Sequence, residues 1–178
     1  IVQFAWQAMS LTTRHRSRSS EYAQQSAADF DEVMATNLKG VWLCAKYQIE
    51  ALLDQGEGGA IINTSSWLAH GALAGSSIYS ASKGALDAMI RALALEYGRQ
   101  GIRINNICPG IIDTPMARSS GDVAAHQPFV EHTPMKRMGQ PEDIGDVAVW
   151  LASDGARFIT GQSILVDGGY TIGGLRWQ

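Results

Sequence analysis

Apolar and polar positions follow a helical pattern from Ser26 onward. Ser26-Ala-Ala-Asp29 has the form of a capping box, in which Ser26 starts a helix and Asp29 bonds back to it. The apolar residues that follow recur at helical spacing: Phe30, Val33, Met34, Val41 and Ala45. This pattern predicts a long first helix over about residues 27–54.

Two more helices and three strands are expected further along the chain. A second helix over about residues 76–97 is marked by an apolar stripe of Leu86, Met89, Ile90, Leu93 and Tyr97. A third helix has Pro141 at its first position. Short apolar runs without alternation are typical of strands buried on both faces, and they cover residues 60–64 and 102–108; a last strand is expected over residues 163–166. The alternation of strands and helices predicts an α/β fold with a parallel sheet flanked by helices.

The long stretch over residues 111–140 is punctuated by proline and glycine. It is interpreted as either a substrate lid or a loose loop. Residues 1–25 also differ from the rest. Arg14, His15, Arg16 and Arg18 lie among serines and threonines without helical or strand periodicity. We therefore expect an atypical, poorly ordered segment over residues 1–25 and one folded domain over residues 26–178.

Composition and charge exclude several classes of protein. Of 178 residues, 46% are hydrophobic and 17% are charged, as in a soluble globular domain. The net charge of −3 argues against a nucleic-acid or anionic-membrane partner. No apolar run reaches the roughly 18 residues of a membrane span. A cytoplasmic location is therefore expected.

Cysteine and histidine positions show no metal-binding pattern. Cys44 and Cys108 lie in apolar segments without CxxC spacing, so we expect both to be buried, reduced thiols. His70, His126 and His132 lack the spacing of metal ligands. No metal is therefore expected.

The candidate chemistry centres on Tyr79-Ser-Ala-Ser-Lys83. Positions i and i+4 of a helix share a face, so the phenol of Tyr79 and the ammonium of Lys83 can enter one site. A tyrosine titrates near pH 10, and a nearby ammonium stabilises its phenolate. The pair taken alone is also compatible with an ordinary surface contact.

Ser66 and Asn37 strengthen the case for a catalytic site. Ser66 follows a predicted strand, 13 positions before Tyr79, and parallel sheets place their ligand sites at the carboxyl ends of strands. A turn or helix cap is the alternative role for this serine. Asn37 falls on the apolar stripe of the first helix, where a buried amide needs partners. A structural network or a helix kink is the alternative there.

These residues belong to a set of motifs that resembles the short-chain dehydrogenase/reductase family. The set has the family's order and spacing and comprises Asn37-Leu-Lys-Gly40, Asn63-Thr-Ser-Ser66, Tyr79-x-x-x-Lys83, Pro109-Gly110 and Asp167-Gly-Gly169. The resemblance extends over about residues 26–174. It implies a Rossmann-like sheet and NAD(P)-dependent hydride transfer between an alcohol and a ketone or aldehyde.

The resemblance also implies roles for individual residues. Tyr79 would be the general acid/base, and Lys83 would lower its pKa and bind the nicotinamide ribose. Ser66 would position the substrate oxygen, and Asn37 would hold a water that relays protons to Lys83. Pro109, Gly110, the Ile112 backbone and the Thr114 hydroxyl would contact the nicotinamide carboxamide, whereas Cys108 would be a bystander. The two long helices, 27–54 and 76–97, resemble the pair through which the family forms homo-oligomers.

The sequence departs from the family at its front. The first βαβ strands and the glycine-rich phosphate loop are missing, and with them the residue that selects NAD or NADP. Thr12-Thr13-Arg14 stands where the family has an Asn-Asn-Ala-Gly turn. Their codons, ACN-ACN-CGN, can encode Asn-Asn-Ala when read one base earlier. One hypothesis is therefore that residues 1 to about 20 are out of frame or a remnant; a lineage-specific tail is the alternative.

Two functions follow from this sequence. The first is an active oxidoreductase acting on a moderately apolar alcohol or ketone. The second is a truncated, catalytically impaired relative that persists only as an associating subunit or a non-functional fragment. We expect weak cofactor binding, because the pyrophosphate lacks its site at a helix N-terminus.

Overall fold

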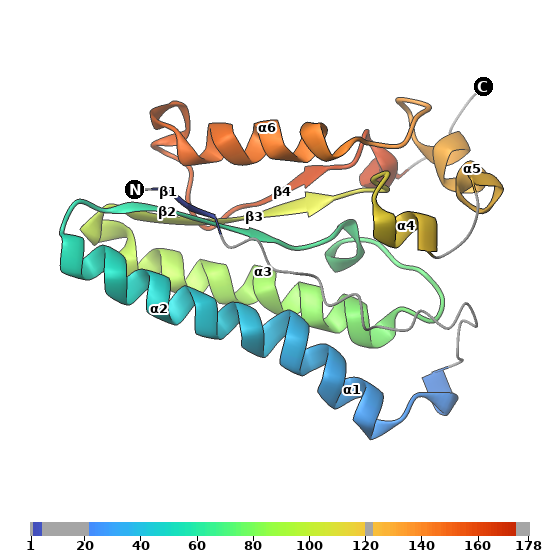
Figure 1. Cartoon of the computed structure of the whole chain (residues 1–178), viewed down its shortest axis with the longest axis horizontal. Coiled ribbons are helices and arrows are strands. Elements are labelled where there is room, and N and C mark those ends of the chain that lie inside the picture. Colours follow the sequence, from blue (N-terminus) through green and yellow to red (C-terminus); the bar gives the residue numbers. More distant parts are fainter. Residues whose placement is uncertain (1, 5–21, 120–122, 174–178) are drawn as a thin grey trace.

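Helices cover both faces of a parallel sheet (Figure 1). The computed structural model describes residues 2–4, 22–119 and 123–173. Its four strands lie side by side in the order of the sequence, β1 (Val2–Phe4), β2 (Gly59–Thr64), β3 (Ile102–Pro109) and β4 (Ser163–Val166). Every neighbouring pair is parallel. This arrangement confirms the predicted α/β fold.

The strand β1 corrects the expectation for the first residues. Its three residues pair in register with Ala60, Ile61 and Ile62 of β2. A three-residue strand is too short to show a pattern in the sequence, and the neighbouring strand supplies its hydrogen bonds. The remainder of the stretch expected to be atypical, including Thr12-Thr13-Arg14, lies mostly outside the described residues.

The first predicted helix is present but is interrupted by a wider turn. The Ser26–Asp29 capping box begins α1 (Ala27–Met34), and α2 (Gly40–Gln55) continues it. Between them, η2 (Ala35–Lys39) is a π-helical turn. Such turns are rare and occur frequently at functional sites.

The two long helical segments and α6 sandwich the sheet between them. Figure 1 shows α1, α2 and α3 (Ser77–Tyr97) on one face and α6 (Pro141–Ala152) on the other. The first interface is closed by Ile49, Leu52, Ile61, Ile90, Ile102 and Ile104. The second is closed by Ala60, Ile62, Ile107, Ala148, Leu151 and Ala156. Each buried isoleucine or leucine contributes about 1.5–3 kcal/mol of transfer free energy.

The face of the sheet toward α3 changes character along its strands. Alternate residues of a strand share a face, so Ile102 and Ile104 are followed on that face by Asn106 and Cys108. All four side chains are buried. The sheet is therefore apolar at its start and polar at its carboxyl end, where a parallel sheet places its site.

The segment 111–140 contains two helices, α4 (Pro115–Ser119) and α5 (Val123–His132). Figure 1 shows both near the carboxyl end of β3, so the stretch is partly helical and not a loose loop. Cys44 is exposed, contrary to expectation, whereas Cys108 is buried. Within the described residues, no helix is both long and apolar enough to cross a membrane.

Candidate active site

Ser66 lies just beyond the end of β2, where the chain turns into η3 (Trp67–Ala69). Its hydroxyl accepts a hydrogen bond from the backbone N–H of Leu68 at 3.2 Å and caps this short turn. The Ser66 side chain is nearly inaccessible to solvent. The cap predicted as the alternative role is thus present, and it fixes the orientation of the hydroxyl.

Tyr79 lies in the first turn of α3 and is half-buried. Burial raises the pKa of its phenol, and a hydrogen-bonding interaction with the Ser66 side chain opposes that shift. The Ser66 side chain therefore lies close enough to the Tyr79 phenol to affect its pKa. The direction of the pKa shift differs from expectation, because the cost of removing a phenolate from water exceeds the favourable interactions around it.

Lys83 is one helical turn further along α3 and is only 1% exposed. Its Nζ donates a hydrogen bond to the Thr64 carbonyl oxygen at 2.9 Å and lies 5.8 Å from the centre of the Tyr79 ring. Burial lowers the pKa of the amine to about 8, and the nearby Cys108 opposes this shift. The amine is therefore held inside the protein, facing the end of β2.

Asn37 lies in the π-helical turn and is buried. Its Nδ2 donates to the Oγ of Ser82 at 3.1 Å, and Ser82 in turn donates to the Tyr79 carbonyl oxygen at 2.7 Å. Among the described residues, no hydrogen bond joins Asn37 directly to Lys83. Asn37 is thus joined to α3, the helix that carries Tyr79 and Lys83, by its hydrogen bond with Ser82.

The Pro109–Thr114 segment leaves the carboxyl end of β3 beside the site. The N–H of Gly110 donates to the Val166 carbonyl at 3.0 Å, and a Cβ on Gly110 would lie 2.7 Å from the Asp167 Cα. Glycine is therefore required where the segment after β3 passes close to the segment after β4. Thr114 accepts a hydrogen bond from the Ala117 N–H at 3.3 Å, which makes its hydroxyl a cap of α4.

Ile112 forms an isolated parallel bridge with Gly139. The bridge uses the Ile111 carbonyl and the Asp113 N–H, each 2.9 Å from its Gly139 partner. The N–H and carbonyl of Ile112 itself point the other way. Within the described part of the chain, they make no backbone hydrogen bond.

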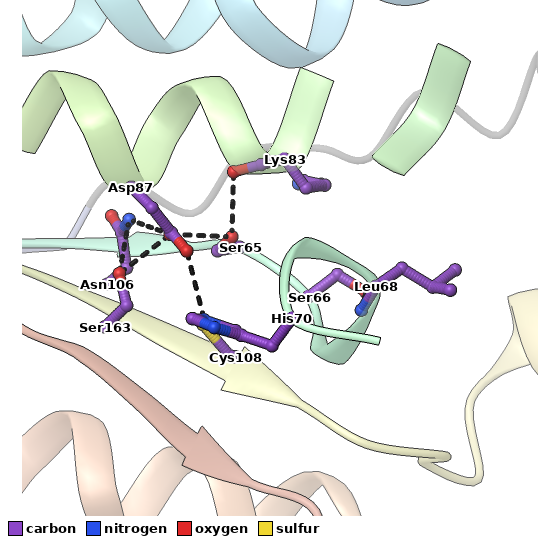
Figure 2. A network of polar contacts seen from close by, with 9 residues as sticks. All are labelled: Ser65, Ser66, Leu68, His70, Lys83, Asp87, Asn106, Cys108 and Ser163. Carbon is purple, nitrogen blue, oxygen red and sulfur yellow. Dashed lines mark hydrogen bonds and ion pairs between the residues drawn. The ribbon is translucent and has the colours of Figure 1, made fainter. Parts of the chain in front are cut away.

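A buried polar network between α3 and the carboxyl ends of β2 and β3 was not predicted from the sequence (Figure 2). Its centre is Asp87, one turn after Lys83 on α3 and only 7% exposed. The Oδ1 of Asp87 accepts from the side chains of Asn106 at 2.9 Å, Ser163 at 2.7 Å and Ser65 at 3.4 Å. Its Oδ2 lies 3.0 Å from the Nε2 of His70. The sequence does contain a signal for this network, because Asp87 is a carboxylate between Leu86 and Ile90 of an apolar stripe.

Aromatic side chains connect Ser66 with the helical segment beyond β3. Trp67 and Tyr170 pack edge to face with ring centres 4.9 Å apart, and Phe129 of α5 lies 6.1 Å from Tyr170. Trp67 is buried. The residue after Ser66 is therefore packed into an aromatic cluster with Tyr170 and Phe129.

Comparison with known proteins gives the relatives of this chain. The family model described as enoyl-(acyl carrier protein) reductase matches residues 5–171. A protein of Bradyrhizobium diazoefficiens, named as a short-chain type dehydrogenase/reductase, is 37% identical over 162 residues, which are 91% of this chain and 56% of that protein. The chain belongs to the short-chain dehydrogenase/reductase family.

Other short-chain dehydrogenases/reductases show the same partial overlap. The uncharacterised oxidoreductase YxbG of Bacillus subtilis is 40% identical over 147 residues, covering 79% of this chain and 53% of that protein. The structure of 4-hydroxyisoleucine dehydrogenase complexed with NADH and succinate superposes with a TM-score of 0.79 at 31% identity, covering 86% of this chain and 63% of that one. The chain thus spans a little over half the length of the curated relatives it matches.

Proposed function

We propose that this chain carries the proton-handling site of an NAD(P)-dependent oxidoreductase that interconverts an alcohol and a ketone or aldehyde. The proposal is supported by a Ser66 side chain close enough to affect the pKa of the Tyr79 phenol and by a buried Lys83 amine 5.8 Å from the centre of the Tyr79 ring. A carbonyl oxygen placed between the two hydroxyls would receive a hydrogen bond from each. This arrangement polarises the carbonyl and holds a proton beside it.

A nicotinamide cofactor would supply or accept the hydride, which the side chains of this protein cannot do. In the reducing direction, the Tyr79 hydroxyl would give its proton to the oxygen of the carbonyl being reduced. The phenolate that remains is reprotonated from solvent. Because burial raises the pKa of Tyr79, the phenol stays protonated at neutral pH and is ready to donate. The oxidising direction requires a cation near the phenolate.

The described residues fit the nicotinamide end of such a cofactor. An ammonium has three donors, and Lys83 uses one of them on the Thr64 carbonyl within the described residues. The remaining donors suit the hydroxyls of a ribose. The backbone groups of Ile112 make no backbone hydrogen bond within the described part of the chain and could meet a carboxamide, with Pro109, Gly110 and Thr114 as neighbours along the same segment.

The proposed role of Asn37 is to position Lys83 through Ser82 and a water. The π-helical turn widens the helix at Asn37 and directs the amide toward α3. An amide and an ammonium separated by a water can pass protons from solvent to the phenol. This route would restore the proton that Tyr79 donates.

The substrate class is proposed from the aromatic cluster around Trp67. The Tyr170 and Phe129 rings pack together, and Tyr170 packs on the buried ring of Trp67, the residue after Ser66, so we propose a moderately apolar alcohol or ketone. The helical segment over residues 111–140 would act as the substrate lid. A cytoplasmic location stays a prediction.

A second candidate function is that of a catalytically impaired relative that only associates with other subunits. The observation behind it is the set of large apolar side chains on the helices that cover one face of the sheet. Association would use the exposed faces of α2 and α3, where Trp42, Tyr47 and Leu95 are 50%, 60% and 86% exposed.

Titration of the chain with NADH and NADPH, followed by nicotinamide fluorescence and by turnover with aliphatic and aromatic ketones, separates the two candidates. The oxidoreductase proposal expects weak binding but measurable, ketone-dependent oxidation of one cofactor near saturation. Micromolar affinity would rule out the impaired candidate. Absence of turnover at saturation with every ketone would reject the oxidoreductase proposal for this chain.

A further inference from the structure

Three side chains of the kinds that bind transition metals converge between α3 and the end of β3: His70, Asp87 and Cys108 (Figure 2). They come from the turn after β2, from α3 and from the end of β3. Their ligand atoms, Nε2, Oδ2 and Sγ, all lie within 4.8 Å of one another. The Nε2 of His70 is 3.0 Å from the Asp87 oxygen and 3.6 Å from the Cys108 sulfur.

Hydrogen bonds alone do not explain why all three side chains meet at one point. The carboxylate and the sulfur approach the same ring nitrogen, which carries either one proton or one lone pair. A nucleophilic Cys–His–Asp relay is excluded as well, because it needs the sulfur and the carboxylate on opposite nitrogens of the ring. A cation among the three atoms, in contrast, contacts all of them at once.

The two distances from the His70 nitrogen can be compared with those of a small tetrahedral site. With a Zn–S bond of about 2.3 Å and Zn–N and Zn–O bonds of about 2.0–2.1 Å, the S···N separation is about 3.6 Å and the N···O separation about 3.3 Å. The first agrees with the distance found between Cys108 and His70. The second requires His70 and Asp87 to move apart by only about 0.3 Å.

The surroundings of Asp87 resemble the support that metal-binding carboxylates receive. Three donors hold its Oδ1, from Asn106, Ser163 and Ser65, and leave Oδ2 directed at the convergence point. Hydrogen-bonded outer groups of this kind orient a ligand before the ion arrives. The side chain of His70 is 35% exposed, which gives an ion a path from solvent to the two buried ligands.

We propose that His70, Asp87 and Cys108 form a binding site for Zn²⁺ or a similar thiophilic divalent cation, with water as the fourth ligand. Binding would replace the proton of the Cys108 thiol, which passes to solvent. One thiolate and one carboxylate would then balance the two charges of the ion. The ion would tie together the Ser66 turn, the Tyr79–Lys83 helix and the start of the Pro109–Gly110 segment, and so stabilise their mutual placement.

Cobalt titration of the chelator-treated full chain tests this site, because tetrahedral Co²⁺ bound to a thiolate has characteristic visible and charge-transfer absorption. We expect one Co²⁺ per chain with a thiolate charge-transfer band, and displacement by Zn²⁺. Cys108→Ser should abolish that band, whereas Cys44→Ser, which changes the exposed thiol, should keep it. A wild-type chain without the band, or a Cys108→Ser chain that retains it, overturns the proposal.

His70→Asn is the second variant, because its partly exposed side chain can change with little risk to the fold. Circular dichroism without metal checks that the variant is folded. We expect at least a tenfold loss of Zn²⁺ affinity and loss of the rise in melting temperature that Zn²⁺ causes in the wild type. His132→Asn, on α5, is the matched control and should bind as the wild type does. Equal affinity in His70→Asn and wild type contradicts the site.

Discussion

The Nζ of Lys83 donates a hydrogen bond to the Thr64 carbonyl oxygen, 2.9 Å away, and so joins α3 to the end of β2. This contact holds a buried amine beside Tyr79 and the Ser66 turn. Fully buried ammonium groups are costly, because water solvates the charge better than the protein interior does. The placement of Lys83 therefore has consequences for stability that can be measured without a substrate.

Lys83→Met should change how stability depends on pH. Burial lowers the folded-state pKa of Lys83 to about 8 from its ordinary 10.5, so between these values the unfolded chain binds more protons than the folded one. Stability of the wild type should therefore rise with pH across this window, and below about pH 8 the full cost of burial remains. In urea unfolding, the free energy of unfolding of the wild type should rise by about 2 kcal/mol relative to that of Lys83→Met between about pH 7 and pH 9.5.

The exposed Lys46, which pairs with Glu50 on the helix surface, supplies the control for that experiment. Lys46→Met should show the same pH dependence as the wild type. If Lys83→Met and wild type follow parallel curves, the amine of Lys83 is not buried as described.

Ser82→Ala should destabilise the chain by about 1–3 kcal/mol, because it leaves the buried Nδ2 of Asn37 without its partner. The higher helix propensity of alanine offsets only a few tenths of that loss. Ser77→Ala, on the exposed side of the same helix, should remain within about 0.5 kcal/mol of the wild type. Chemical denaturation measures both. Equal stabilities for the two variants would place Asn37 outside any structural network.

Asp87→Asn tests the polar network without reference to a metal. The carboxylate accepts three hydrogen bonds on one oxygen and pairs with His70 on the other, and an amide cannot replace both oxygens as acceptors. We expect the free energy of unfolding to fall by about 2–3 kcal/mol, measured with a chelator present. The exposed Asp54→Asn should have almost no effect. A loss below about 0.5 kcal/mol in Asp87→Asn would contradict this view of the network.

The sequence predicted most of the fold because its signals are local. The Ser26–Asp29 capping box and Pro141 mark true helix starts in the structure. The apolar runs 60–64 and 102–108 are buried strands. Each of these elements is specified by a few neighbouring residues, and the parallel arrangement follows from their alternation.

Features that depend on distant parts of the chain could not be predicted in this way. His70, Asp87 and Cys108 meet only because the turn after β2, α3 and β3 pack together. The direction of the Tyr79 pKa shift depends on burial, which its spacing from Lys83 does not reveal. Cys44 lies about a quarter turn away from the buried stripe of Val41, Ala45 and Ile49, so its apolar neighbours in sequence were misleading.

Trp42→Glu should weaken association between copies of the chain. Trp42 on α2 is 50% exposed, and homo-oligomers proposed to form through α2 and α3 would cover it. A charge in an apolar interface leaves an unpaired buried group, so we expect a shift toward monomer in sedimentation velocity. Trp150→Glu, on the opposite face of the sheet, should not change the mass. An unchanged oligomer in Trp42→Glu would place the interface elsewhere.

The most direct test of the account compares Tyr79→Phe with Tyr22→Phe in ketone-dependent oxidation of NADH or NADPH near cofactor saturation. Tyr22 is 77% exposed and serves as the matched loss of a hydroxyl. We predict that Tyr79→Phe lowers the turnover number by about 10²–10⁴-fold, the usual range for loss of a positioned acid, while Tyr22→Phe leaves it unchanged. A Tyr79→Phe chain that turns over as fast as the wild type would contradict the assignment of Tyr79 as the proton donor.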